Sequence, residues 1–542
     1  MDENRPDRIR PVAAPIRAVA GEAFDYLAKS FPVCCGSDEF FYFPQVVPPS
    51  DRRSGWDDFS TIRIEDAKRR LSAWESGAGL LAGAAADREE REDAAVLHRL
   101  LRTLREQLEE VRFHETQPTF HLTVLCTGLA AALGSGDREA WGNRVRTAPA
   151  FLARARETLA GMPRPFRDLG AAMVADAHAW LRTLDPRGED LARLNSALAR
   201  FGEFLGNARV KDRFLLPPGV FGRVVRDHIG CAAGADEVRE AIVEELRETA
   251  GILDGTCAGK MPGGDWREAI RSLPPPELSG GDLLKKYAEE IDGLLEHCLG
   301  IGIVPSDLPG AVPLSVRPLP PYLRAVRAAS SYAFTPGDAG GSGTFHVVLS
   351  EGSGDGPRED PADIRMLAAH ETWPGHHLLD SRRWRHSSPV RRSVELPLFY
   401  EGWACFAEEL MRFTGYFSGP DDLLILARRR HRRAVRGLID LDLQTGALDP
   451  GSAAALLART GIPPAAAASA VAKYALRPGY QVCYSLGLRR FLDLYARYGE
   501  GGAGRFAGAV LSGGETGFDL VEDALRRAAR DPGAAGSGRT GA

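Results

Sequence analysis

A short run of this 542-residue chain contains the side chains needed to bind a catalytic metal ion. The run reads His370-Glu371-Thr372-Trp373-Pro374-Gly375-His376-His377, and Glu401 follows further along the chain. Imidazole nitrogens and carboxylate oxygens are zinc ligands, and catalytic sites use three protein ligands so that water takes the fourth position. We therefore predict one Zn2+ ion bound by His370, His376 and Glu401. Glu371 is adjacent to a ligand and is our candidate general base.

The spacing of the two histidines is incompatible with a straight α-helix. At about 100° per residue, His376 is turned about 240° from His370, onto the wrong face. His377 returns to the right face, but it lies about 10 Å further along the helix axis. Pro374 lacks an N–H and would clash with the carbonyl group of residue 370, so a straight helix is excluded here in any case. We predict that Pro374 and Gly375 bulge outward and bring His376 into the ligand position, with His377 as the alternative.

Two predicted helices carry the candidate ligands. The first begins near Asp360-Pro361-Ala362-Asp363, where an N-cap residue, a proline at N1 and an acid in the first turn occur together. The second covers residues 398–411 and is apolar on almost every face, so we expect it to be buried. A buried carboxylate such as Glu401 needs a partner, either a metal ion or an arginine of segment 382–392. Glu408 shares a side with Glu401 and is predicted to orient a ligand histidine or, alternatively, to be a ligand itself.

The predicted ligands and base favour hydrolysis of an amide bond. A metal ion of this kind lowers the pKa of bound water and polarises a carbonyl group. Glu371 would accept the proton of the water and return it to the leaving amine. A biosynthetic amide hydrolase for one small metabolite, and a metal-braced binding protein with weak catalysis, are the alternatives. Manganese, iron or cobalt is an alternative to zinc, because two imidazoles and a carboxylate also bind those metals.

The histidine run resembles the His-Glu-x-x-His signature of zincin metallopeptidases, with two residues inserted before the second histidine. Together with Glu401-Gly402-Trp403-Ala404 and segment 477–487, it is similar to the bacterial "domain of unknown function 885" family. That resemblance covers most of the chain. It implies a zinc-dependent peptidase related in plan to the mostly helical angiotensin-converting-enzyme and oligopeptidase clan. It also implies that Tyr484 donates a hydrogen bond to the developing oxyanion.

Two departures from the family pattern bear on activity. Gln444 stands where family members commonly have histidine, and glutamine donates a hydrogen bond but carries no proton charge. The Pro-Gly-Gln-Ala expected near the tyrosine is replaced by Pro478-Gly479-Tyr480-Gln481. An oxyanion donor contributes a few kcal/mol to lowering the barrier, so these changes predict weaker or redirected catalysis.

The remaining sequence predicts a mainly α, zincin-like metallopeptidase fold with a small β-sheet and a deep central cleft between two lobes. Helical patterns cover residues 63–110, 145–183, 236–254 and 281–299. Segments 311–316 and 344–349 read as short strands, either a buried hairpin or an edge that pairs with an extended peptide. We predict an N-terminal tail (1–20), a helical lobe (21–340), a zinc-site lobe (341–530) and a flexible C-terminal tail (531–542).

Composition and charge restrict the partners of the chain. The net charge of −5 and the sequence pI of about 6.2 argue against nucleic acid as the main partner. The N-terminus lacks a hydrophobic signal region and no apolar run is long enough for a membrane span, so we expect a cytoplasmic protein. The eight cysteines have no disulfide or zinc-ribbon spacing and are predicted to be reduced. A peptide or a small amide is the expected substrate.

Two further motifs are assigned structural roles. His114 and His121 echo the metal motif, but no buried acid follows them, so we expect packing or local hydrogen bonding. The arginine-rich segment 428–433 is predicted to form a solvated helix face that pairs with acids. Arg436 or Arg477 would hold a substrate carboxylate if its guanidinium faced the site.

Overall fold

The structure, a computed structural model, describes residues 16–85, 87–184, 188–273, 280–323, 329–337, 341–349 and 361–530. These residues form a mainly helical protein with one small β-sheet, which confirms the predicted secondary-structure class. Helix α1 (Ile16–Ser30) already begins within the range predicted as N-terminal tail. The predicted C-terminal tail and the predicted N-cap residue Asp360 lie outside the described residues.

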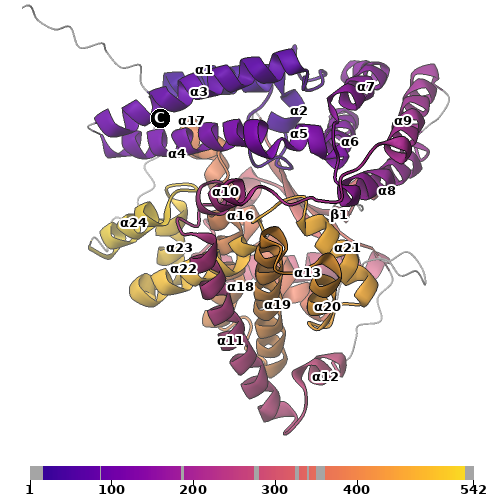
Figure 1. The fold of residues 1–542 in the computed structure, drawn as a ribbon. Helices are drawn as coiled ribbons and strands as arrows, with labels where there is room; N and C mark the ends of the chain where they lie inside the picture. Colours follow the sequence, from indigo (N-terminus) through magenta and orange to yellow (C-terminus); the bar gives the residue numbers. More distant parts are fainter. Residues whose placement is uncertain are drawn as a thin grey trace, which may run out of the picture.

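The predicted helical segments of the first half are present, although 63–110 and 145–183 are each divided between two helices. Segment 63–110 becomes α3 (Thr61–Ala84) and α4 (Arg88–Glu106), which pack against each other (Figure 1). Asp87 starts α4 by accepting a 2.9 Å hydrogen bond from the Glu90 backbone N–H. The other elements of this half are α2 (Pro32–Cys35), η1 (Gln107–Val111), α5 (Phe113–Thr116), α6 (Pro118–Gly134), α7 (Arg138–Thr158), α8 (Arg164–Leu181), α9 (Glu189–Asn207), α10 (Pro218–Arg223), η2 (Val224–Ile229), α11 (Ala235–Lys260), α12 (Trp266–Arg271), α13 (Gly280–Gly300) and α14 (Leu308–Ala311).

The helices of the second half surround the predicted metal ligands. Helix α18 (Pro397–Phe413) packs along α22 (Val482–Tyr498), and α19 (Pro420–Thr445) packs along α11, as the middle of Figure 1 shows. The predicted buried helix at 398–411 corresponds to α18, whose residues from Pro397 to Met411 are all buried. The other elements are η3 (Pro321–Leu323), η4 (Pro361–Asp363), α15 (Ile364–Glu371), α16 (His376–Trp384), α17 (Pro389–Ser393), α20 (Pro450–Ala458), α21 (Pro464–Tyr474), η5 (Gly499–Gly501), α23 (Ala503–Leu511) and α24 (Phe518–Arg530).

The sheet has three strands in the order β1-β3-β2. Strand β3 (Ser342–Val347) pairs in parallel with β1 (Leu314–Pro318) and antiparallel with β2 (Ser331–Thr335). Strands β1 and β3 overlap the two predicted strands, whereas β2 was not predicted. Because β2 is an edge strand, its outward N–H groups need other partners. Glu371 accepts from Tyr332 N at 2.8 Å and the Asp38 carboxylate accepts from Phe334 N, so an added peptide strand would have to displace both acids.

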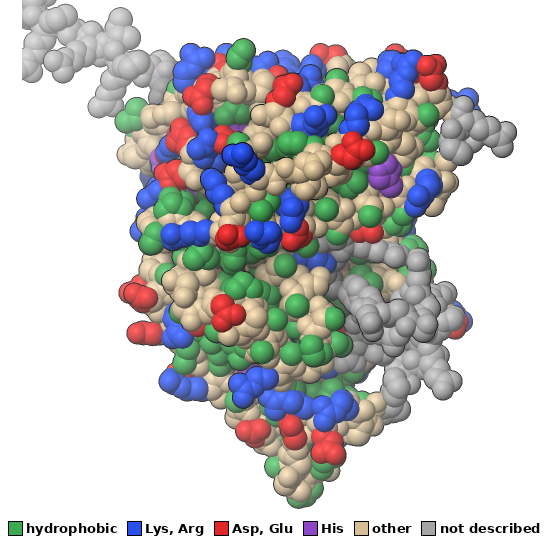
Figure 2. All heavy atoms as spheres, turned by 45° about the vertical axis from the view of Figure 1, so that its right-hand side comes forward, with side chains coloured by type: hydrophobic (Ala, Val, Ile, Leu, Met, Phe, Trp, Pro, Cys, Tyr) green, Lys and Arg blue, Asp and Glu red, His purple; other side chains and the backbone are tan. Residues whose placement is uncertain are grey.

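One large hydrophobic core extends from α1 to α24. It includes residues from both sides of the predicted lobe boundary, for example Tyr287 and Phe345, whose ring centroids are 5.0 Å apart. The division into two lobes stays a prediction. Within the described ranges, none of the helices combines the length and apolar character required to cross a membrane. On the face drawn in Figure 2, basic and acidic side chains are interspersed, in keeping with the small net charge.

Candidate metal centre

A break between two helices, rather than a bulge within one, places the histidines. Helix α15 ends at Glu371 and α16 begins at His376, with a non-helical turn over residues 372–375 between them. Gly375 is required in this turn, because a Cβ atom there would lie 1.9 Å from the His370 carbonyl oxygen. The prediction that Pro374 and Gly375 bulge out of one continuous helix is therefore wrong. The chain leaves one helix and enters a second, which frees His376 from the angular constraint of a continuous helix.

Helix α18 brings Glu401 to the same place. Gly402 and Gly487 allow α18 and α22 to approach closely, since a Cβ on Gly402 would lie 2.5 Å from the Gly487 Cα. The alternative partners for Glu401 are the five arginines of segment 382–392, and three of them form ion pairs with other acids: Arg383 with Asp380 and Glu515, Arg385 with Asp307, and Arg391 with Asp93 and Glu92. Among the described residues, the two histidines are the groups within ion-pair distance of the Glu401 carboxylate.

His370, His376 and Glu401 are buried, and one potential ligand atom from each lies within 4.8 Å of the others. Glu401 Oε2 is 3.6 Å from His370 Nε2 and 3.5 Å from His376 Nε2. Two ligand atoms bound tetrahedrally at the usual zinc distances are separated by about 3.3–3.5 Å. Glu401 Oε2 also accepts no hydrogen bond from any residue that the structure describes, although it is buried. An orphaned buried carboxylate oxygen facing two imidazoles fits a divalent cation.

Glu408 contacts the nitrogen of His370 that faces away from Glu401. Its Oε1 lies 3.1 Å from His370 Nδ1 and can accept from the Nδ1–H group, which directs Nε2 toward Glu401. Arg429 donates to Glu408 at 2.9 and 3.0 Å, and Arg433 donates at 2.6 Å. Burial alone would raise the pKa of Glu408, but these two guanidinium groups hold it well below its usual range. The predicted orienting role of Glu408 therefore matches its position, whereas its alternative role as a ligand does not.

The two adjacent histidines have different environments. The His376 ring stacks on Tyr400, with centroids 4.0 Å apart, and its Nε2 faces Glu401. His377 instead points to Tyr332, whose hydroxyl is 3.0 Å from His377 Nδ1. Burial lowers the pKa of His377 to about 3, so this ring is neutral. The structure thus groups His376, and not the alternative His377, with the other candidate ligands.

Glu371 and Tyr484 are the predicted catalytic groups. Glu371 follows His370 directly, and its Oε2 is held by the Tyr332 backbone N–H. Burial and the negative charge of Glu401 raise the pKa of Tyr484 well above its usual value, so its hydroxyl stays protonated and can donate. Its ring lies 5.9 Å from the Arg433 guanidinium, which contacts His370, and its hydroxyl keeps the proton that an oxyanion donor requires.

Tyr480 is a site residue that the sequence analysis did not identify. Its hydroxyl donates a 2.8 Å hydrogen bond to Glu401 Oε1, the oxygen that does not face the histidines. Asp440 fixes the turn that carries Tyr480, because it accepts hydrogen bonds from the backbone N–H groups of Gly479 (3.0 Å) and Gln481 (2.9 Å). The signal in the sequence was the altered Pro478-Gly479-Tyr480-Gln481 segment, which introduces this tyrosine.

The other motifs have structural contacts. The Gln444 side-chain oxygen accepts from Leu216 N at 3.3 Å. His121 Nε2 contacts the His114 carbonyl oxygen at 2.7 Å within an aromatic cluster, as expected for a packing role. The predicted solvated face at 428–433 is wrong, although its pairing with acids is confirmed. The buried arginines of this segment, with their acids, are Arg428 (Asp363), Arg429 (Glu408), Arg430 (Glu245) and Arg433 (Glu408).

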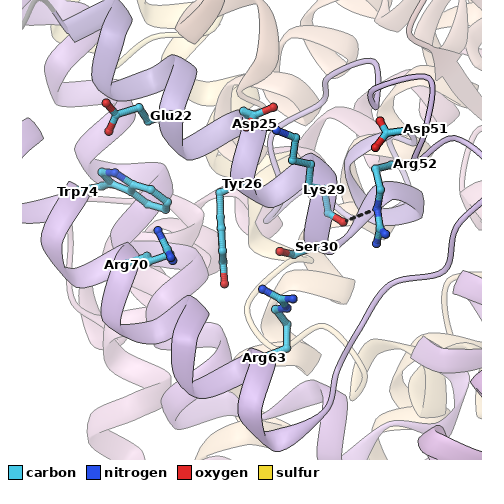
Figure 3. A pocket seen from close by; sticks show the side chains of 10 residues that line it. All are labelled: Glu22, Asp25, Tyr26, Lys29, Ser30, Asp51, Arg52, Arg63, Arg70 and Trp74. Atoms are coloured by element: carbon cyan, nitrogen blue, oxygen red, sulfur yellow. Dashed lines mark hydrogen bonds and ion pairs between the residues drawn. The ribbon is translucent and has the colours of Figure 1, made fainter.

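A surface pocket of about 600 Å3 lies apart from these residues, between α1, α3 and residues 51–52 (Figure 3). Its walls carry both charges, and several of its ions are already paired, such as Lys29 with Asp25 and Arg70 with Asp66. The Tyr26 and Trp74 rings form its apolar part, 5.6 Å apart. None of the candidate metal ligands lines this pocket, and we assign it no role in the chemistry.

Comparison with known proteins gives a family and a fold. The sequence profile described as "Bacterial protein of unknown function (DUF885)" matches residues 47–525. The structure is similar to that of a "putative lipoprotein of unknown function" from Shewanella oneidensis, with 17% identity, a TM-score of 0.71, and coverage of 95% of this chain and 100% of that one. A "putative lipoprotein" from Colwellia psychrerythraea gives 15% identity, a TM-score of 0.71, and coverage of 95% and 99%. No curated protein matches.

Proposed function

The chain belongs to the DUF885 family of bacterial proteins of unknown function, and we propose that it is a zinc-dependent hydrolase of peptide or peptide-like amide bonds. The observation that carries this proposal is the buried grouping of His370, His376 and Glu401, in which Glu401 Oε2 has no hydrogen-bond donor among the described residues. Such a donor set fits a catalytic divalent cation, and the neighbouring Glu371 supplies a base.

Each residue has a distinct part in the proposed reaction. A zinc ion held by His370, His376 and Glu401 would lower the pKa of a water molecule and polarise the substrate carbonyl. Glu371, held through one oxygen by Tyr332 N, would accept a proton from that water through its other oxygen. The water oxygen adds to the carbonyl carbon, the C–N bond breaks, and Glu371 returns the proton to the amine nitrogen. Tyr484 donates a hydrogen bond to the carbonyl oxygen as its negative charge grows.

The zincin-like fold, the central cleft between two lobes and the cytoplasmic location belong to this proposal as well. The solved structures support the helical fold, and their description as lipoproteins applies to those two proteins. The expected partner is a peptide or small amide substrate, without a nucleic acid or membrane partner.

Turnover by the zinc-loaded chain tests the proposal. We expect cleavage of members of a peptide library, and we expect Glu371→Gln to slow cleavage by about 10²- to 10⁴-fold while the zinc content stays unchanged. Retained zinc without cleavage of any peptide would instead favour the single-metabolite hydrolase or the weakly catalytic binding protein. A chain that binds no zinc when metal is supplied would remove the hydrolase proposal altogether.

A further inference from the structure

Arg436 differs from the other arginines of α19 in its partners. The preceding arginines are each within ion-pair distance of an acid: Arg428, Arg429 and Arg432 of Asp363, Arg429 and Arg433 of Glu408, and Arg430 of Glu245. Arg436 forms no ion pair with any described residue. Its Nε donates to the Gln481 side-chain oxygen at 2.8 Å, and its Nη2 donates to the same oxygen. A neutral amide thus stands where each of its neighbours has a carboxylate.

The Arg436 guanidinium is nevertheless held in a fixed position. It lies over the Tyr484 ring, 4.6 Å from the centroid, and 5.5 Å from the centroid of Tyr474. The contact with Gln481 occupies the Nε/Nη2 edge, which leaves the Nη1/Nη2 edge for a second ligand. That edge matches the two oxygens of a carboxylate, and a guanidinium ordered in advance loses little entropy when it binds one. Glu401 and Asp440 act on Arg436 only at longer range, so a carboxylate in direct contact with the guanidinium would add a hydrogen-bonded ion pair that the chain itself does not supply.

Two chains of contacts connect Arg436 to the candidate metal centre. Tyr484 lies under both Arg436 and Arg433, and Arg433 Nη2 is 3.3 Å from His370 Nδ1. On the other side, Gln481 follows Tyr480, whose hydroxyl binds Glu401. Arg477, the other arginine considered for this role, donates instead to the backbone carbonyl of Glu39.

We propose that Arg436 binds a free carboxylate of the substrate, so that the chain selects peptides or N-acyl amino acids whose terminal carboxylate lies close to the bond to be cleaved. The choice of substrate class rests on the proposed hydrolase function. The binding of a carboxylate by Arg436 does not, and it can be measured without turnover.

The test compares two libraries of tetrapeptides that differ in one group, a C-terminal free acid or its amide. The full chain, supplied with zinc and carrying Glu371→Gln to prevent turnover, is incubated with each library, and retained peptides are quantified by mass spectrometry. We expect the acids to bind at least about 10-fold more tightly than the amides. Arg436→Gln should weaken acid binding by about 10- to 100-fold and leave amide binding unchanged, because it removes a charge-assisted hydrogen-bonded pair.

Three further variants test whether a lost preference for acids reflects carboxylate binding by Arg436 or a disturbed fold. Arg436→Lys, which keeps the charge but loses the planar edge, should give an intermediate preference for acids. Gln481→Ala, which removes only the neutral partner, should keep the preference. If Arg436→Gln does not fold, as judged by its thermal unfolding, the acid preference of Arg436→Lys and Gln481→Ala tests the proposal instead. Equal retention of acids and amides, including retention of neither, would overturn the proposal, as would loss of the preference in Arg477→Gln instead.

The failure of this inference is distinguishable from the failure of the proposed function. A zinc-loaded chain that retains acids through Arg436 but cleaves none of them would remove the hydrolase proposal and leave the carboxylate site. A chain that cleaves amides as well as acids would keep the hydrolase proposal and remove the role of Arg436.

Discussion

Replacing Glu408 with glutamine separates its role in metal binding from its role in stability. Glu408 is completely buried, and its carboxylate contacts His370 Nδ1, Arg429 and Arg433. Glu408→Gln keeps the volume of the side chain but removes its charge and replaces one acceptor oxygen with an NH2 group. The two arginines then lose an anionic partner, and His370 Nδ1–H loses the carboxylate that selects its tautomer.

The contacts set the expected magnitudes. Removing one partner from a buried ion pair costs about 3–5 kcal/mol. Because the glutamine oxygen still accepts one or two of the hydrogen bonds, we expect the free energy of unfolding to fall by about 3 kcal/mol. Loss of a carboxylate that orients a ligand histidine lowers metal affinity by about 10- to 100-fold. We therefore expect the zinc dissociation constant to rise by that factor.

The assay measures zinc affinity by competition with a chelator and stability by urea unfolding of the metal-free protein. The adjacent Glu409 offers a matched control, because it is also buried and paired with Arg412 (2.8 Å) and Arg430 (3.5 Å) but contacts neither histidine. Glu409→Gln should lose stability without losing zinc affinity. Equal zinc affinity in Glu408→Gln and Glu409→Gln would refute the assignment of Glu408 as the group that orients His370.

Two other residues give predictions of stability. Burial raises the pKa of Asp440 from 3.8 to about 7, despite the backbone N–H groups that bind it. The folded chain therefore holds this proton more tightly than the unfolded chain, so the contribution of Asp440 to stability falls by up to about 4 kcal/mol as pH rises from 4 to 7. Asp440→Asn should remove that slope from urea unfolding measured across this range, and parallel pH profiles for the two proteins would contradict the assignment. Gly375→Ala should cost about 3 kcal/mol or more and weaken zinc binding, because its Cβ would collide with the His370 carbonyl. Gly251→Ala, at a helical glycine with open space, is the control and should be neutral or slightly stabilising. Equal thermal unfolding of both glycine variants would show that the turn tolerates a side chain.

The sequence predicts which residues form the candidate site better than it predicts the backbone path that brings them together. His370, His376 and Glu401 could be selected because imidazoles and a buried carboxylate in close succession have few other uses. Helical periodicity excluded a straight helix through His370 and His376, but it could not distinguish a bulge from two separate helices. That distinction depends on the local packing of residues 372–375, where Trp403 Nε1 donates to the Pro374 carbonyl at 2.9 Å. A contact between residues so far apart leaves no mark in local sequence patterns.

Other features that the sequence did not predict also depend on contacts between residues far apart in the chain. Arginines at 428–433 are typical of an exposed helix face, yet their acids lie on other helices and in η4, which cover them. Tyr480 was missed because its partner Glu401 lies on another helix, and strand β2 was missed although it is as long as β1. In contrast, the helices within 63–110 were predicted because their apolar residues recur at helical spacing, and the helix at 398–411 because it is apolar on almost every face; both contribute to the core.

The zinc content of two neighbouring histidine variants tests the central claim most directly. His376 faces Glu401, whereas His377, also buried, points to Tyr332. We predict that the purified chain binds one zinc ion, that His376→Ala loses it, and that His377→Ala keeps it, each measured by elemental analysis after dialysis against micromolar zinc. Loss of zinc from His377→Ala with retention in His376→Ala, or no zinc in the unaltered chain, would contradict the account.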